Sequence, residues 1–296
     1  MTVDVLFPFY GDVDLMKQAL QSVLDQRYRD FRVVVVDDCY PDDSVEPWFR
    51  SLNDPRVEYH RNSANLGANG NYRKALSLAH NELIVVMGAD DVMLPTYLNW
   101  LVDSASRYPQ AAAFQPGVFV MDENGVPSRT MADRVKDVCR PRLRGPRLLT
   151  GQRLAVSLMF GNWLYFPSIG WRSSVIREIG FRPEYDVVQD LALVMDIVVR
   201  GGSLLADDSA QFIYRRHRGS DSSVRALSGA RFAEERRYFQ DTAGDLAAHG
   251  WNEAAASARL RPSSRLHALS LIPRAVLSGN VGAVKDLGIH VISTSR

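Results

Sequence analysis

Hydrophobic positions in the first third of the chain alternate between two spacings. Residues 3–7, 33–36 and 83–87 are short apolar runs rich in β-branched side chains, which is typical of strands buried on both faces. Between them, apolar residues recur every three or four positions over residues 15–24 and 72–79, the spacing of helices with one buried face. This alternation predicts a doubly wound α/β layer, in which a mostly parallel sheet is flanked by crossover helices.

The pattern continues along the chain and then becomes helical. It predicts helices over residues 97–108, 154–160 and 187–200, and strands over 111–121 and 204–214. Residues 129–147 hold seven Arg or Lys against two Asp, together with two prolines, which indicates a basic loop. From residue 227 onward the pattern predicts helices, and residues 259–296 form a basic amphipathic tail.

Composition narrows the class of protein. The 296 residues are 46% hydrophobic with a net charge of +1, which indicates one main folded core and gives no reason to expect a nucleic-acid partner. Cys39 and Cys139 define no disulfide framework, so we expect a reduced, cytoplasmic compartment. The first residues lack a basic, apolar leader, and the uncharged run 154–171 is broken by glycine and proline, so we expect neither a signal peptide nor a membrane-spanning helix.

Two adjacent carboxylates, Asp90 and Asp91, directly follow the third apolar run. Carboxylates held close together raise each other's pKa, and a divalent cation such as Mg²⁺ or Mn²⁺ relieves that repulsion. The alternative is a cap for the next helix, since Asp is favoured at helix N-termini. The residues themselves leave both interpretations open.

A second carboxylate pair, Asp37 and Asp38, follows the second apolar run. A carboxylate there can accept a hydrogen bond from a uracil or thymine imide or from a ribose hydroxyl, although a simple turn is the alternative. A third loop, over residues 65–71, is rich in Asn and Gly, which tolerate positive φ and offer amide hydrogen bonds, and Arg73 follows it.

Taken together, these segments resemble family 2 glycosyltransferases, which have the GT-A fold. The resemblance is carried in order by residues 5–10, 20–26, 31–38, 65–67 and 88–91, and then by residues 162–172, 178–181, 189–190 and 214–222. It implies a glycosyltransferase domain over about residues 1–224, with a nucleotide-binding half (1–95), an acceptor half (96–224) and a helical C-terminal extension (225–296).

The resemblance also implies roles for individual residues. The nucleotide-sugar would be bound by Pro8, Phe9, Tyr10, Asp37, Asp38, Asn65, Arg73 and Asp90. A divalent metal, Mn²⁺ or Mg²⁺, would be held by Asp91 with Asp90 and by His217. The sequence departs from the family's Asp-x-Asp-Asp pattern, because Gly88 replaces its first Asp.

Asp190 matches the catalytic base of the family, which takes the proton of the acceptor hydroxyl as the anomeric carbon is attacked. Gln189 replaces the Glu that usually precedes this base, and a helix cap is the alternative role for Asp190. The acceptor would lie against Trp163, Tyr165 and Trp171, although we expect at least two of the aromatic residues in this segment to be core side chains. For His217, a solvated loop position is the alternative.

The expected reaction is therefore inverting, metal-dependent transfer of a sugar from a UDP- or dTDP-sugar to a hydroxyl of a glycan, glycolipid or related acceptor. Cell-envelope or capsular polysaccharide synthesis is the family's usual setting. A nucleotidyltransferase would need a glycine-rich basic loop after the first strand, where residues 8–12 supply none, and a non-catalytic sugar-nucleotide-binding protein is the other alternative. The tail would pack on the core or on a second subunit, or lie peripherally on the inner face of the membrane.

Overall fold

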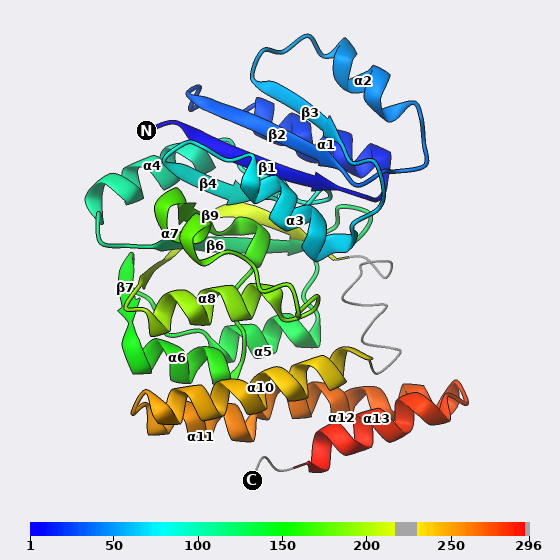
Figure 1. Cartoon of the computed structure of the whole chain (residues 1–296), viewed down its shortest axis with the longest axis vertical. Coiled ribbons are helices and arrows are strands. Elements are labelled where there is room, and N and C mark those ends of the chain that lie inside the picture. Colours follow the sequence, from blue (N-terminus) through cyan, green and yellow to red (C-terminus); the bar gives the residue numbers. More distant parts are fainter. Residues whose placement is uncertain (217–229, 294–296) are drawn as a thin grey trace.

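The structure is a computed structural model that describes residues 1–216 and 230–293. Its centre is one twisted sheet with the strand order β3-β2-β1-β4-β8-β6-β9-β5, and β7 pairs with β9 (Figure 1). The strands are β1 (Val3–Phe9), β2 (Phe31–Asp37), β3 (Val57–Arg61), β4 (Leu83–Val86), β5 (Val92–Met93), β6 (Ala113–Met121), β7 (Arg147–Thr150), β8 (Gly170–Arg172) and β9 (Ser203–Arg215).

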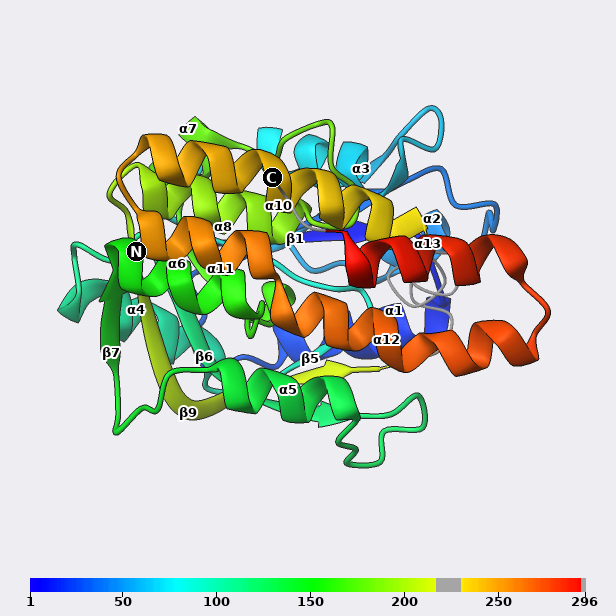
Figure 2. The same ribbon diagram turned by 90° about the horizontal axis from the view of Figure 1, so that it is seen from below.

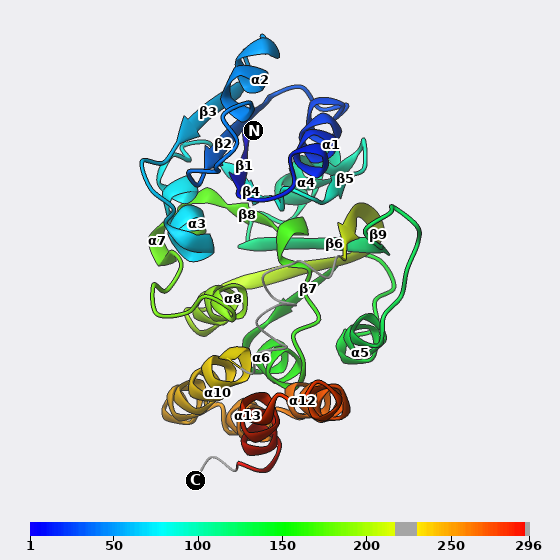
Figure 3. The same ribbon diagram turned by 90° about the vertical axis from the view of Figure 1, so that its right-hand side faces the viewer.

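Helices cover both faces of this sheet and form a further layer below it (Figure 3). They are α1 (Val13–Leu24), α2 (Val45–Ser51), α3 (Gly67–Ser77), α4 (Tyr97–Arg107), α5 (Met131–Cys139), α6 (Gly151–Phe160), α7 (Ser173–Ile179), α8 (Gln189–Val199), α10 (Ala230–Ala248), α11 (Asn252–Leu260), α12 (Pro262–Leu277) and α13 (Val281–Ile292).

The N-terminal half of the sheet is parallel, as the apolar runs predicted. β1 lies between β2 and β4 and is parallel to both, and β2 is parallel to β3. Alternate residues of these strands enter different cores: Val5 packs with the helices α1 and α4, whereas Leu6 packs on the side of α3 and α8. Burial on both faces explains why the strands are continuously apolar.

The second half of the sheet is mixed. The short strand β8 is antiparallel to both β4 and β6, while β6 and β9 are parallel to each other. The register of β6 and β9 shifts on either side of Gly117, where a Cβ atom would lie 2.5 Å from the Asp208 carbonyl oxygen. A residue without a side chain is therefore required at this irregularity.

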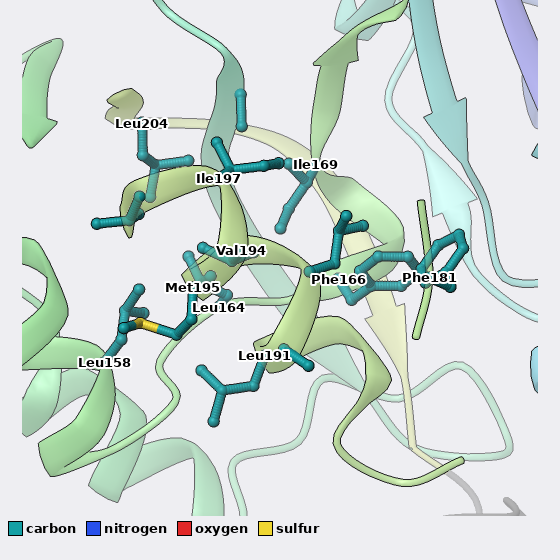
Figure 4. Packing of buried hydrophobic residues seen from close by; sticks show 14 of the residues in the cluster. Leu158, Leu164, Phe166, Ile169, Phe181, Leu191, Val194, Met195, Ile197 and Leu204 are labelled. Carbon is teal, nitrogen blue, oxygen red and sulfur yellow. The ribbon is translucent and has the colours of Figure 1, made fainter. Parts of the chain in front are cut away.

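Helix α8 is the most apolar helix of this half and is buried along most of its length. Leu191, Val194 and Met195 of α8 pack among side chains from α6, β9 and the short helix Phe166–Ser168 (Figure 4). Helices α10 and α11 contribute to the same core, so α6 and α8 share buried apolar surface with the start of the C-terminal extension. The division of the chain at residue 224 stays a prediction.

Two sequence predictions need correction. Residues 129–147 are not only a loop, because they contain α5, which begins with a capping box in which Thr130 and Asp133 satisfy each other's backbone N–H groups. The pattern also missed α2 and β3, whose apolar positions are too few to show a clear period. In the described part of the chain, no helix is long and apolar enough to cross a membrane.

Candidate active site

Strands β1, β2 and β4 end at one edge of the sheet, and the candidate site lies there because the strands are parallel. Asp38 follows β2, and Asp90 and Asp91 follow β4. The N-terminus of α8, which carries Asp190, comes to the site from the C-terminal half of the chain.

Asp91 is buried, and only one of its two carboxylate oxygens has a hydrogen-bond partner among the described residues. Asp91 is 1% exposed, and its Oδ1 atom accepts a hydrogen bond of 2.8 Å from the Arg215 backbone N–H. Its Oδ2 has no hydrogen-bond partner among the described residues. Burial and the adjacent Asp90 raise the pKa of Asp91 well above its usual range. A positive partner at this oxygen would offset the cost of the anionic form.

A divalent metal fits that requirement. Hard cations prefer carboxylate oxygens, and the orphaned Oδ2 atom of Asp91 offers one beside a second carboxylate, Asp90. Within residues 1–216 and 230–293, no three His, Cys, Asp or Glu side chains are clustered as a complete ligand set. His217, the expected third ligand, lies outside the described residues.

Gly88 is explained by the position of Asp91. A Cβ atom at residue 88 would lie 2.5 Å from Asp91 Oδ2 and 3.1 Å from Asp90 Oδ1. Both carboxylates therefore fold back over a position that has no side chain. The replacement of the usual Asp by Gly88 accommodates this arrangement of the remaining pair.

The two carboxylates at the end of β2 have different hydrogen-bond partners. Asp37 is fully buried and accepts hydrogen bonds from the Tyr40 backbone N–H (2.7 Å) and the Tyr59 hydroxyl (2.5 Å). Each oxygen of Asp37 therefore helps to hold the turn after β2, and a role of Asp37 in binding the nucleotide stays a prediction. Asp38 accepts from Asn62 Nδ2 (2.9 Å) and the Leu66 backbone N–H (2.8 Å), both through Oδ1.

Of the three residues expected to flank the nucleotide base, only one is exposed to solvent. Pro8 and Phe9 are buried in β1, whereas Tyr10 is 56% exposed. Tyr40, which the sequence analysis did not single out, lies edge-on to Tyr10 with ring centroids 5.4 Å apart. The aromatic surface at this edge therefore consists of Tyr10 and Tyr40, and the expectation that Phe9 flanks a ligand is corrected because its ring faces the core.

The residues expected from the third loop lie at its surface. Asn65 is exposed, and its Oδ1 accepts a 2.9 Å hydrogen bond from the Gly67 N–H at the start of α3. Arg73 is exposed on α3. Two other asparagines of this region are buried: Asn71 links Asn62 to the Val36 carbonyl, and Asn69 donates to the Arg182 and Tyr185 carbonyls. These bonds join the loop to β2 and to the segment before α8.

Asp190 lies in the first turn of α8. Its Oδ1 accepts from the Leu191 N–H (2.7 Å), and its Oδ2 lies 3.4 Å from Asn162 Nδ2. The helix cap position is Val188, so Asp190 is not the N-cap that the alternative interpretation required. Burial raises the pKa of Asp190, and the Leu191 N–H and the positive charges of Lys136 and Arg231 partly offset that effect.

Two tyrosines respond to the charge of Asp190 and of the carboxylate pair after β4. Burial raises the pKa of Tyr72 and of Tyr214, and the negative charges of Asp90, Asp91 and Asp190 raise both further. All three carboxylates therefore lie within electrostatic range of the same two tyrosine side chains.

Helix α5 supplies a polar network that the sequence analysis did not find. Asp133 accepts hydrogen bonds from the Arg216 guanidinium and, at 2.9 Å, from the Tyr165 hydroxyl. Lys136 donates to the Asn162 carbonyl (3.0 Å) and to the Leu164 carbonyl, and its Nζ lies 4.5 Å from the centre of the Tyr165 ring. The available signal was the basic character of residues 129–147.

The expected acceptor aromatics separate into core and site. Trp163 and Trp171 are 2% and 0% exposed and pack in the core, so no sugar ring can stack on them in this structure. The expectation is corrected for these two residues, and the prediction that at least two aromatics of the segment are core side chains is confirmed. Tyr165 is only partly buried and stays a candidate.

Comparisons with known proteins agree with this geometry. A family model described as Glycosyl transferase family 2 matches residues 4–165. Among curated relatives, the succinoglycan biosynthesis protein ExoO of Rhizobium meliloti is 27% identical over 221 residues, which are 74% of this chain and 62% of that protein. The putative colanic acid biosynthesis glycosyl transferase WcaA of Escherichia coli is 32% identical over 98 residues, covering 33% of this chain and 35% of that protein.

Solved structures share the fold. TarS 1–349 of S. aureus in complex with UDP-GlcNAc matches with a TM-score of 0.66 at 17% identity, over 98% of this chain and 82% of that chain. The mannosyltransferase PcManGT of Pyrobaculum calidifontis in complex with GDP-Man and Mn²⁺ matches with a TM-score of 0.62 at 16% identity, over 97% and 78%. At these identities the likeness concerns the fold.

Proposed function

The chain belongs to glycosyl transferase family 2, and from this premise we propose that it is an inverting, metal-dependent glycosyltransferase. It would move a sugar from a UDP- or dTDP-sugar to a hydroxyl group of a glycan, glycolipid or related acceptor. The observation that carries the proposal is the buried Oδ2 atom of Asp91, which lies beside Asp90 and has no hydrogen-bond partner among the described residues. The shared effect of Asp90, Asp91 and Asp190 on the pKa of Tyr72 and Tyr214 supports one common site.

The metal would be Mn²⁺ or Mg²⁺, held by Asp91 with Asp90, and His217 is the proposed third ligand. When bound, it would neutralise negative charge on the diphosphate leaving group. The complex of PcManGT with Mn²⁺ supports a divalent ion in this fold. Arg215, whose Nε donates to the Asp90 carbonyl at 2.8 Å, fixes the backbone of the carboxylate pair for that purpose.

The nucleotide would bind at the end of β2. Asp38 is buried and held by Asn62 and Leu66, so it presents a fixed carboxylate at the sheet edge. A carboxylate accepts the imide N–H of uracil or thymine, which is the basis for proposing a UDP- or dTDP-sugar. Tyr10 and Tyr40 would contact the base. The TarS complex with UDP-GlcNAc supports a uridine donor, whereas the PcManGT complex contains a guanosine donor.

Asp190 would act as the general base. Direct displacement with inversion needs one carboxylate to take the proton of the attacking hydroxyl. A raised pKa makes the deprotonated carboxylate of Asp190 a better proton acceptor than that of an exposed Asp. Asn162 and the Leu191 N–H orient its two oxygens. Tyr165, on the same loop as Asn162, would contact the acceptor.

Polysaccharide synthesis at the cell envelope is the proposed setting. The names of ExoO and WcaA place those two relatives in the synthesis of succinoglycan and colanic acid. A lipid-linked or glycan hydroxyl would then be the acceptor, and the enzyme would work at the inner face of the membrane.

The proposal is tested by three single substitutions measured side by side. Asp91→Asn should abolish the effect of Mn²⁺ on donor binding, measured by calorimetry with UDP-GlcNAc and dTDP-glucose. Asp190→Asn should keep metal-dependent donor binding and lower transfer to an envelope extract by about a hundredfold or more, the usual effect of removing a general base. Asp103→Asn, an exposed position on α4, is the control.

Each outcome has a distinct meaning. Metal-dependent donor binding with no transfer in the unmodified protein would favour a sugar-nucleotide-binding protein without catalysis. Full transfer activity in Asp190→Asn would remove Asp190 from the mechanism. Donor binding that is unaffected by metal in every variant would contradict the proposed role of Asp90 and Asp91.

A further inference from the structure

The last two helices form a hairpin whose outer face is apolar and open to solvent. Helix α12 exposes Leu266, Leu269, Val276 and Leu277, which recur at intervals of three, seven and one, on one side of the helix. Leu277 is 88% exposed and Val281, at the start of α13, is 80% exposed. These two residues flank the turn, so the tip of the hairpin is its most exposed apolar part.

This exposure is not the result of a loosely attached tail. The inner face of the hairpin has its own core, in which Ala268, Ala275 and Leu287 pack against Phe232 of α10. A buried polar network joins the same helices: Ser264 donates to Glu235 and contacts His290 Nε2 at 2.8 Å, and His290 Nδ1 contacts the Phe232 carbonyl at 3.1 Å. The hairpin is therefore packed firmly against α10, and its apolar outer face remains exposed to solvent.

The charge around this face selects the class of partner. Residues 254–296 contain one acidic residue, Asp286, against six basic ones: Arg259, Arg261, Arg265, Arg274, Lys285 and Arg296. Arg259, Arg274 and Lys285 are exposed. A second copy of the chain would bring the same positive charges together, because a two-fold interface joins identical patches. An anionic lipid surface complements both the charge and the apolar side chains.

The position of the hairpin also suits a surface-bound acceptor. In Figure 1, β1 and β2 run toward the right-hand side of the view, and the turn between α12 and α13 lies on that side. Figure 2 also shows this turn at the right-hand end of the molecule. The carboxyl ends of these strands carry the candidate site. A membrane at the hairpin would therefore lie on the side of the molecule where the site is.

We propose that the outer face of the α12–α13 hairpin docks on an anionic lipid bilayer, with Leu277 and Val281 entering its interfacial region. Apolar burial would supply one part of the affinity, and Arg274 and Lys285 would supply a part that weakens with salt. This inference concerns where the protein binds and does not depend on the proposed reaction.

The test is co-sedimentation of the full chain with vesicles of phosphatidylcholine alone and of phosphatidylcholine with about one third phosphatidylglycerol, a content that gives a marked negative surface potential. The expected result is binding to the anionic vesicles only, reduced by added salt. The double substitution Leu277→Ser with Val281→Ser should weaken it about tenfold or more, since it removes the apolar part of the interaction. Both positions are exposed, so the fold should be kept, and circular dichroism checks this.

Val138→Ser is the matched control, because Val138 is 81% exposed and belongs to α5 and not to the hairpin. Equal binding by the double variant and the control, or no binding to anionic vesicles, would overturn the proposal. Sedimentation velocity provides the second arm: a dimer of the unmodified chain that the double variant abolishes would assign the face to a second copy instead.

Discussion

Asp190 has an environment that should be visible in the pH dependence of the reaction. Burial raises its pKa, and the base acts only when deprotonated, so transfer should rise with pH through a value above that of an ordinary Asp, which is about 4. The measurement is kcat/KM for transfer between pH 4 and 7. An acidic limb with its midpoint at pH 4 or below would show that Asp190 titrates normally or does not act as the base.

If Asp190 is the base, as proposed, Lys136 is expected to position it. Its ammonium group holds the carbonyls of Asn162 and Leu164, and Asn162 contacts Asp190. Its positive charge also lowers the pKa of Asp190. Lys136→Met should therefore reduce kcat/KM by about tenfold, which corresponds to about 1.4 kcal/mol. It should also move the rise of activity at acidic pH to higher pH, because loss of the positive charge raises the pKa of Asp190.

The pH dependence of activity at high pH provides a second test of the role of Lys136. Burial lowers the pKa of Lys136 to about 8, so the ammonium loses its charge and its donor strength above that pH. The unmodified protein should lose activity above pH 8, and Lys136→Met should not show this limb. Lys136→Arg, which stays charged, should shift the limb upward. A variant with reduced activity but an unchanged pH profile would indicate a role in folding alone.

Individual site residues could be predicted from the sequence where a neighbouring segment of the chain marks their position. Asp38, Asp90 and Asp91 directly follow apolar runs, and the parallel sheet places such positions at one edge. Lys136 and Tyr40 had no such signal. The contacts of Lys136 are made across 26 and 28 residues of sequence, and only the packing of α5 brings them about.

Helix α10 is the element that ties the C-terminal extension to the candidate base. Glu234 Oε1 accepts from the N–H groups of Val187 (2.7 Å) and Val188 (3.0 Å), which lie at the N-terminus of α8. These groups have no partner within their helix, so a carboxylate from another helix takes the place of a cap. The extension thereby fixes the turn that carries Asp190.

Loss of this contact should affect both stability and transfer. Glu234→Ala is expected to lower the free energy of unfolding by about 1–3 kcal/mol, the range for hydrogen bonds to a charged group, and to reduce transfer more than donor binding. Urea unfolding and calorimetry measure the two effects. Glu253→Ala, at an exposed position on α11, is the control. A Glu234→Ala protein with the stability of the control would show that α8 does not need this carboxylate.

The elements that the sequence pattern predicted are those with a long, regular period. α1, α4 and α8 fall close to the predicted ranges, because each repeats its buried positions over several turns. The helix predicted over 72–79 begins earlier, since α3 spans Gly67–Ser77 and includes most of the segment 65–71 that was expected to be a loop. Helix α5 escaped notice because its residues are mostly exposed and charged, and its start depends on the Thr130–Asp133 capping box. β8 is three residues long and owes its place to its neighbours β4 and β6.

The whole molecule contains a buried histidine that should make it sensitive to acid. Burial lowers the pKa of His290 to about 4, whereas an unfolded His titrates near 6.5. Between these values the unfolded chain binds a proton that the folded chain does not, so stability is fully present above pH 6.5 and is lost as pH falls toward 4.

The expected loss is up to about 3 kcal/mol in the free energy of unfolding between pH 6.5 and 4, the equivalent of about two and a half pKa units. Urea titrations at several pH values measure it. His290→Gln should be less stable at neutral pH, since it disturbs the contacts with Ser264 and Phe232, but should show a flatter dependence on pH. The same slope in both proteins would assign the acid sensitivity to other groups.

The central claim concerns the whole protein: it binds a nucleotide-sugar together with a divalent metal at the edge formed by Asp38, Asp90 and Asp91. The most direct test is the melting temperature of the unmodified chain with UDP-, dTDP- and GDP-sugars, each with Mn²⁺ and with a chelator. A ligand that binds only the folded state raises the melting temperature by mass action. The account predicts a rise with a UDP- or dTDP-sugar that requires the metal, and no rise with any donor, in Mn²⁺ or in chelator, would contradict it.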